Sequence, residues 1–209
     1  MTTETARARA SAAAGRTRPT DPVLYELVTP GAGPVRLKDA KAYLKVDNKS
    51  DDFVVRSLLL AVVQYAEKYT GRDFRANGWK LLLDGFEDRI CLRRSPVASV
   101  TQVQYTLAGT LTTIAATVYY LKKGPQWSEV LLLDEQEWPS DGDDVETTNE
   151  HTIEITFATA VPALLEEARS AMLRHLAYLY QNRGDCSSEE AARRSGATEM
   201  YDHFRVARL

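Results

Sequence analysis

The most constraining feature of this chain is an apolar run inside its first long predicted helix. Residues 58–63 are Leu-Leu-Leu-Ala-Val-Val, within a helical pattern that covers residues 51–70. Six consecutive apolar side chains occupy more than one face of a helix with 3.6 residues per turn. Such a helix needs cover on several sides, either from within the fold or from other copies of the chain. A chain of 209 residues has few internal layers, so repeated assembly is a hypothesis from the outset.

Composition restricts the class of protein. The chain has 26 Lys and Arg against 29 Asp and Glu, a net charge of −3, whereas a dedicated nucleic-acid binder usually has a basic patch or a high pI. No run reaches the roughly 18–20 apolar residues of a membrane span, and no apolar segment indicates a secretory signal. Cys91 and Cys186 belong to no metal-binding motif, which favours free thiols over a disulfide.

Local patterns divide the chain into an arm, a domain and a tail. Residues 1–34 are predicted to be a flexible basic arm, because their Ala-, Thr- and Arg-rich start keeps no apolar face. An idle arm is favoured over one that contacts DNA or a partner. The domain spans residues 35–184 and starts with helices over 36–45 and 51–70. Gly71 fits the left-handed position beyond the end of the second helix.

Alternating patterns predict a β insertion over residues 79–158 of the domain. Short strand candidates are separated by turn residues; they cover 79–84, 89–93, 97–107, 111–114, 118–122, 129–133 and 151–157. They predict a small antiparallel sheet, sandwich or barrel. Pro162 then opens a second long helix over 162–183. The predicted fold class is therefore α+β, with a helical core of two long helices and a short one, an inserted β-sheet or sandwich, and flexible termini.

Two further segments have a distinctive composition but no regular helix or strand pattern. Residues 134–150 contain eight acidic residues and no basic one, which is typical of an exposed loop. Residues 185–209 begin polar, with a possible helix from Ser188, and end with aromatic, aliphatic and arginine side chains. This tail is interpreted either as a docking peptide that becomes ordered on a partner or as a segment that packs on its own domain.

The sequence offers little for catalysis. None of the three histidines has a second His or Cys at ligand spacing, and no phosphate-binding, dinucleotide-binding, zinc-protease or serine-hydrolase motif is present. Glu166 and Glu167 are adjacent, so they point to different parts of a helix surface. We expect no catalytic residue, no cofactor and no metal site.

Aromatic side chains favour interaction over chemistry. Tyr65 and Tyr69 lie four residues apart on the first long helix, with Arg72 beyond its end. Tyrosine and arginine are frequent at interfaces because they combine contact area with polar anchoring. A contact between subunits and an aromatic pair in the core of one copy both remain open.

An ordered set of motifs over residues 36–183 resembles the tailed-bacteriophage head–tail connector proteins, also called adaptor or head-completion proteins. The resemblance is to the long-tailed-phage type with a β insertion. Its features are Tyr-Ala-Glu-Lys-Tyr-Thr-Gly-Arg ending at Arg72, the strand at 79–84, Leu-Arg-Arg-Ser-Pro-Val-Ala-Ser-Val at 92–100, Tyr105, and the helix from Val161-Pro162 to Tyr-Gln-Asn-Arg at 180–183. The arm and the tail lie outside it.

The resemblance implies a structural protein of the virion neck, assembled in the host cytoplasm. Such proteins form a ring, commonly of twelve copies, beneath the portal protein. The ring extends the DNA channel without sequence-specific binding and is a platform for the next neck or tail-completion protein, a stopper or a terminator. The overly apolar helices agree with this expectation, because neighbouring subunits of a closed ring would cover them.

Candidate residues follow from combining the resemblance with the residue patterns. Portal-binding candidates in the tail are Tyr201, Phe204, Arg205, Arg208 and Leu209. Candidates for contacts between subunits are Leu59, Tyr65, Tyr69 and Arg72. The acidic loop candidates, either beside the DNA path or on an outer rim, are Asp141, Asp143, Asp144 and Glu146. The alternatives are a tail-completion or terminator ring protein, a nucleic-acid-binding module, and a small enzyme with scattered carboxylates.

Overall fold

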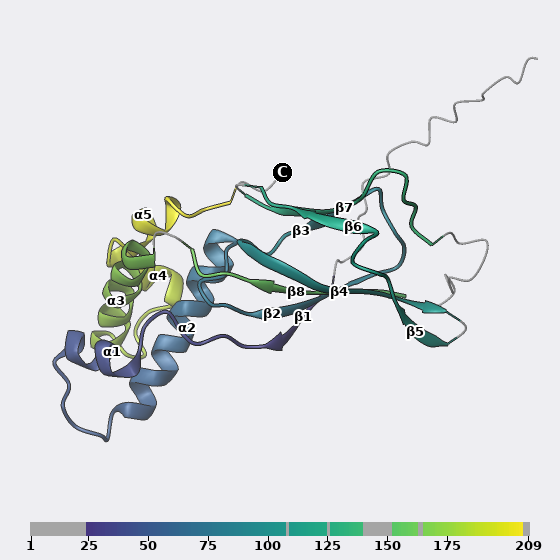
Figure 1. The fold of residues 1–209 in the computed structure, drawn as a ribbon. Coiled ribbons are helices and arrows are strands. Elements are labelled where there is room, and N and C mark those ends of the chain that lie inside the picture. Colours follow the sequence, from purple (N-terminus) through teal and green to yellow (C-terminus); the bar gives the residue numbers. More distant parts are fainter. Residues whose placement is uncertain (1–23, 108, 125, 140–151, 163–164, 207–209) are drawn as a thin grey trace, which may run out of the picture.

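The protein is built from a helical lobe and a β lobe at opposite ends of an elongated molecule (Figure 1). The computed structural model describes residues 24–107, 109–124, 126–139, 152–162 and 165–206. Helices come from both ends of the chain and strands mainly from its middle. The predicted α+β class, with an antiparallel β insertion between the long helices, is confirmed.

The helical lobe is organised around its longest helix. The described helices are α1 (Leu37–Leu44), α2 (Asp52–Thr70), α3 (Leu165–Gln181), α4 (Ser188–Arg194) and α5 (Ala197–Asp202). Helix α2 packs against each of the other four. It ends where predicted, because Gly71 takes a left-handed φ of 70° and donates its N–H to the Glu67 carbonyl at 3.0 Å. None of the described helices combines the length and hydrophobicity needed to cross a membrane.

The C-terminal helices provide much of the cover that α2 requires. Buried α2 side chains share one core with α3, α4, α5 and the residues just after α5; the core includes Val55, Leu59, Val62, Val63, Ala66, Ala171, Met172, Leu176, Ala191, Ala192, Ala197, Tyr201 and Phe204. The alanines on α3, α4 and α5 allow these helices to approach α2 closely. Residues 188–204 therefore pack on their own domain, the second of the two interpretations left open for the tail.

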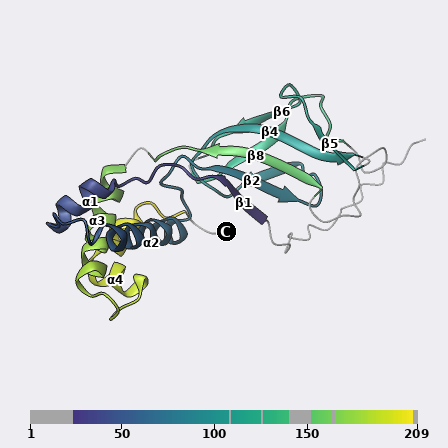
Figure 2. The ribbon, with the colours of Figure 1, turned by 90° about the horizontal axis from the view of Figure 1, so that it is seen from below.

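The β lobe consists of two antiparallel sheets, as Figures 1 and 2 show. Their strands are β1 (Leu24–Thr29), β2 (Gly78–Leu83), β3 (Arg89–Leu92), β4 (Val97–Leu107), β5 (Thr110–Thr113), β6 (Tyr119–Lys122), β7 (Ser128–Leu132) and β8 (Ile153–Thr159). The larger sheet has the order β1-β2-β8-β4-β5 and the smaller one β3-β7-β6. Side chains of both sheets share one core, which includes Leu81, Ile90, Leu92, Val103, Val130 and Ile155. The lobe is thus a sandwich.

Strand β1 corrects the boundary of the predicted arm, which extended to residue 34. It pairs with β2, and the Tyr25 ring lies edge-on to Trp79 and Phe157 at 6.4 and 6.2 Å. The Tyr25 hydroxyl accepts the Arg93 backbone N–H at 2.8 Å, which links β1 to the end of β3. The other β1 side chains are exposed. An edge strand that buries one side chain has little periodicity, so the sequence did not reveal it.

A buried polar network lies where the two lobes meet. The Asp73 carboxylate, between α2 and β2, accepts hydrogen bonds from the Asn77 amide at 2.9 Å, the Thr159 hydroxyl at 3.0 Å and the Trp79 indole N–H. The Arg94 guanidinium lies 3.9 Å from the second Asp73 oxygen and 4.1 Å from the centre of the Trp79 ring. One buried carboxylate thus links the start of β2 to the end of β8, the strand that leads to α3.

Candidate assembly surfaces

An aromatic cluster joins α2 to the C-terminal helices. The Tyr65 and Tyr69 rings stack with their centroids 5.8 Å apart, and Tyr201 lies 6.3 and 6.4 Å from them. The Tyr69 hydroxyl donates to Asp202 at 2.7 Å, and this hydrogen bond is the main reason that the pKa of Tyr69 is raised. Burial raises the pKa of Tyr65. The pair therefore packs on its own chain, while its outer edge lines a hollow with residues of α4 and α5.

His175 occupies the centre of this region and is fully buried. Its Nε2 lies 2.8 Å from the Ser188 carbonyl, which can only accept, so Nε2 carries the proton. The Tyr201 hydroxyl lies 3.5 Å from Nδ1. Burial lowers the pKa of His175 from 6.5 to about 4. A neutral histidine that is closed off from solvent and bonded to a backbone carbonyl anchors α4 to α3 and cannot reach a substrate.

The predicted subunit-contact residues lie mainly against their own chain. Leu59 is part of the helical core, and Tyr65 and Tyr69 belong to the aromatic cluster. The Arg72 Nε donates to the Phe204 carbonyl at 2.7 Å. Leu59 is thus inaccessible to a neighbour, while the edges of the two tyrosines stay at the surface of the hollow. Contact between copies through these residues stays a prediction.

The predicted portal-binding residues divide into two groups. Tyr201 and Phe204 are buried in the helical core, and the Phe204 ring lies edge-on to Phe74 at 5.7 Å. The exposed Arg205 has its guanidinium 5.4 Å from the Tyr69 ring centre. Arg208 and Leu209 lie outside the described residues, as do the acidic loop candidates Asp141, Asp143, Asp144 and Glu146. Of the portal set with described positions, Arg205 is the residue a partner can reach.

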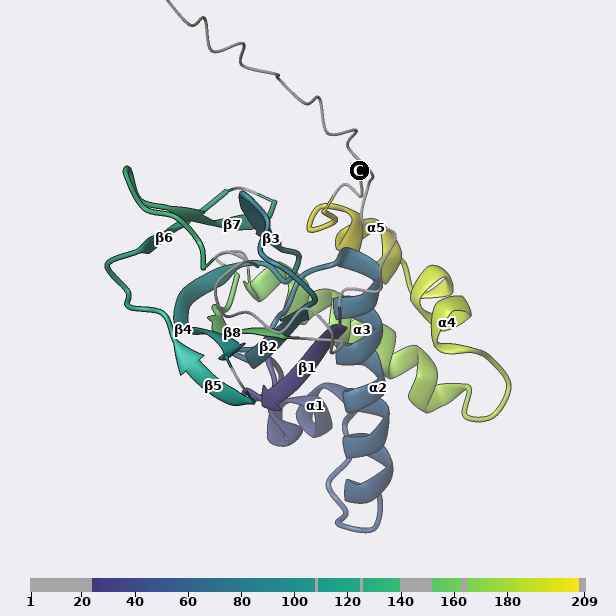
Figure 3. The ribbon, with the colours of Figure 1, turned by 90° about the vertical axis from the view of Figure 1, so that its right-hand side faces the viewer.

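Helix α2 has an apolar surface that remains exposed in the described part of the chain. Phe53 is 79% exposed and Leu60, seven residues further on, is 50% exposed. A spacing of seven residues places both on one side of the helix. Figure 3 shows that the N-terminal half of α2 extends beyond the strands of the β lobe. Two large exposed side chains on one helix face form a candidate contact surface.

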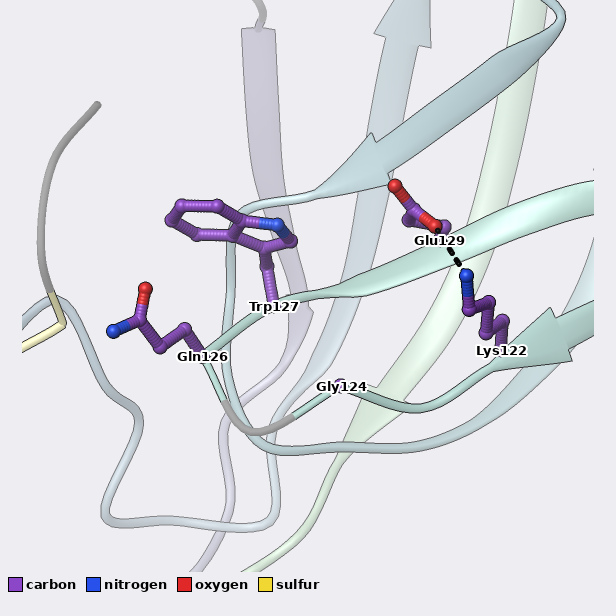
Figure 4. A pocket seen from close by; sticks show the side chains of 5 residues that line it. All are labelled: Lys122, Gly124, Gln126, Trp127 and Glu129. Carbon is purple, nitrogen blue, oxygen red and sulfur yellow. Dashed lines mark ion pairs between the residues drawn. The ribbon is translucent and has the colours of Figure 1, made fainter.

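A basic surface lies at one end of the three-stranded sheet, and we call it the hairpin patch. It consists of Arg93 after β3, Lys122 and Lys123 at the end of β6, and Trp127 before β7. The pairing of Leu92 with Ser128 and of Lys122 with Glu129 brings these segments to the same end of the sheet. The three basic residues are exposed and Trp127 is half-buried. Figure 4 shows the ion pair between Lys122 and Glu129, at 3.6 Å, beside Trp127.

An acidic surface, which we call the acidic tip, lies at the other end of the same sheet. It consists of five exposed residues that precede β3 or follow β7: Glu87, Asp88, Asp134, Glu135 and Glu137. Phe86 and Trp138 stack with their ring centres 4.8 Å apart, and the Trp138 indole donates to the Glu87 carbonyl at 3.0 Å. This stack fixes the two acidic segments side by side.

The described residues do not converge on a metal. In the ranges given above, no group of three His, Cys, Asp or Glu side chains is placed to hold an ion. Cys91 and Cys186 are free thiols. The surfaces that stand out are thus an apolar helix face and two charged ends of a sheet, which are features of contact surfaces.

Comparison with known proteins gives structural matches only. The chain matches no protein-family model and no curated protein. Its fold is similar to that of a chain in the virion of a native gene transfer agent particle, with a TM-score of 0.70 and 22% identity over 89% of this chain and 97% of that one. Chains in the necks of native and empty gene transfer agent particles, computed with C12 and C6 symmetry, give TM-scores of 0.67 at 22% and 18% identity with the same coverage. These likenesses show a shared fold over nearly the whole chain.

Proposed function

We propose that this chain is a structural protein of the neck of a tailed-phage-like particle, where it acts as a head–tail adaptor. Copies form a ring beneath the portal, extend the DNA channel and provide the platform on which the next neck or tail-completion protein assembles. The observation that carries this proposal is the shared fold, which extends over 97% of chains from particle necks. The likeness includes both lobes, because 89% of this chain is covered.

The ring and its copy number rest on the symmetry of those necks. Particle necks computed with C6 and C12 symmetry contain chains of this fold, which supports a ring of twelve copies here. A ring requires a contact surface that is open in the single copy, and the α2 face around Phe53 and Leu60 is such a surface. Arg205 and the residues after it are the proposed contact with the portal.

Electron microscopy of particles made without this protein tests the proposal. Loss of an adaptor should leave DNA-filled heads without tails, because packaging precedes neck completion while tail attachment needs the platform. A terminator ring belongs to the tail, so its loss should instead leave heads with complete necks and confine the defect to the tail. Particles that form normally, with or without infectivity, would contradict both.

A further inference from the structure

The hairpin patch and the acidic tip are oppositely charged ends of one small sheet. The hairpin patch has three exposed cations beside the single carboxylate of Glu129. The acidic tip has five exposed carboxylates next to Arg89. Strand β3 has four residues, so at about 3.4 Å per residue the two ends lie about 14 Å apart. This separation exceeds the Debye length of about 8 Å at physiological salt. The two surfaces therefore do not neutralise each other within one copy.

We propose that the acidic tip of one copy binds the hairpin patch of the next copy. The proposal rests on the proposed ring and names one of its subunit contacts. Each copy would use two different surfaces, so the contact is heterologous, and repeated heterologous contacts close into a ring when their rotation allows it. Opposite charge selects this head-to-tail arrangement, because tip against tip or patch against patch would repel.

A second copy explains the hairpin patch better than DNA does. The patch includes Trp127, and tryptophan with arginine is typical of residues that dominate the energy of protein interfaces. The nearby Glu129 carboxylate, 3.6 Å from the Lys122 ammonium, would repel phosphates at the patch. The acidic tip has the opposite charge to the hairpin patch. A second copy of this chain can therefore be the partner of the patch.

Charge reversal and charge exchange test the contact in the full-length protein. A patch variant carries Lys122→Glu and Lys123→Glu, and a tip variant carries Asp134→Lys and Glu137→Lys. The matched control, Lys38→Glu with Lys49→Glu, makes the same charge change as the patch variant at exposed positions of the helical lobe. All the substituted residues are exposed, so circular dichroism should be unchanged. The unfolding temperature should fall only slightly in the patch variant, where Lys122→Glu sets two carboxylates opposite each other at the Lys122–Glu129 pair. Self-association is measured by analytical ultracentrifugation at low and physiological salt.

The patch variant and the tip variant should each associate about tenfold or more weakly than the wild type, while the control associates normally. An equimolar mixture of the two variants should recover association, because an acidic patch then meets a basic tip and the unchanged surfaces meet each other. A single chain with all four substitutions should recover it as well. If exchanging the charges of the patch and the tip restores self-association, the two surfaces must contact each other.

Four results would overturn the proposal. They are normal association of either charge-reversed variant, failure of the mixture and of the fourfold variant to recover, a wild type that stays monomeric at low salt and high concentration, and closed dimers as the final product. Loss of affinity for duplex DNA in the patch variant, with association intact, would assign the patch to DNA instead. None of these results bears on tail attachment, so particle microscopy still tests the adaptor role separately.

Discussion

Acidification should destabilise the helical lobe through His175. The side chain is fully buried, with Nε2 bound to the Ser188 carbonyl and Nδ1 facing the Tyr201 hydroxyl. In the folded protein the pKa of His175 is about 4, below the value of 6.5 for an ordinary histidine. Neither ring nitrogen has a nearby carboxylate among these partners to stabilise a positive charge, so protonation requires opening of the region where α3, α4 and α5 meet.

The sign and size of the effect follow from linkage. Between pH 6.5 and pH 4 the unfolded chain binds a proton that the native protein does not bind, so the free energy of unfolding falls as the pH falls. The effect is absent above pH 6.5 and complete below pH 4. At about 1.36 kcal/mol per pH unit, the two pKa values correspond to roughly 3 kcal/mol in total. From pH 7 to pH 5 the expected loss is about 2 kcal/mol.

Urea unfolding at pH 7 and pH 5, followed by far-ultraviolet circular dichroism, measures this loss. The comparison variant is His175→Gln, which does not titrate and keeps a donor for the Ser188 carbonyl. Carboxylates titrate equally in both proteins, so the difference between them isolates His175. Between pH 7 and pH 5 the free energy of unfolding should fall by about 2 kcal/mol more in the wild type than in the variant. Equal losses would refute the assignment of a buried neutral histidine.

Three other variants test the packing and the exposed α2 surface described above. Truncation after Gly184 removes Tyr201 and Phe204 from the core and should lower the free energy of unfolding by more than about 3 kcal/mol; a truncated chain as stable as the wild type in urea would show that α4 and α5 are dispensable. Asp73→Ala leaves the buried Asn77 amide and Trp79 indole N–H groups without their acceptor, while the Thr159 hydroxyl can donate to the Arg75 or Asn77 carbonyl instead. It should lower the free energy of unfolding by about 2–4 kcal/mol, whereas a loss below about 1 kcal/mol would contradict the buried network where the lobes meet. Phe53→Ser with Leu60→Ser should change monomer stability by less than about 1 kcal/mol, because both side chains are exposed, yet weaken ring formation seen by electron microscopy; unaffected rings would remove this face from the contact.

The long helices and most strands could be predicted because their signals are local. The pattern over 51–70 with Gly71 beyond it, and the alternation at Ile153, Ile155 and Phe157, reflect the periods of helix and strand directly. Strand β4 shows where such a signal weakens. Its alternation is only partial in the sequence, because its pairing with β8 shifts register twice, between Val97 and Ser99 and between Val100 and Gln102.

The cover of α2 could not be assigned from sequence, because it depends on a segment that is far away along the chain. The buried alanines of α4 and α5 carry little hydrophobic signal individually, yet they let both helices pack closely on α2 and α3. The tail therefore looked too polar to fold by itself. It folds on the domain because its few large apolar groups, Tyr201 and Phe204, enter a core that is already formed by the long helices.

The charged surfaces were hidden for a similar reason. Arg93 and Lys122 are about thirty positions apart, and only the register of β3, β7 and β6 brings them to one end of a sheet. The acidic run was visible, but its neighbours Glu87 and Asp88 join it only through the stack of Phe86 on Trp138. The net charge of −3 is a sum over the whole chain, so it carries no sign of two separate surfaces of opposite charge.

The forces that hold copies together should differ from those expected from the apolar run of α2. Because α3, α4 and α5 cover most of that run, Phe53 and Leu60 are the large apolar groups that α2 leaves well exposed. Two such side chains contribute only a few kcal/mol even when they are fully buried by a neighbour, which is small against the cost of association. On the proposed contact, charge between the acidic tip and the hairpin patch supplies part of the affinity. Ring formation should therefore weaken as salt rises, whereas a ring held by apolar helix packing would persist or strengthen in salts that favour burial.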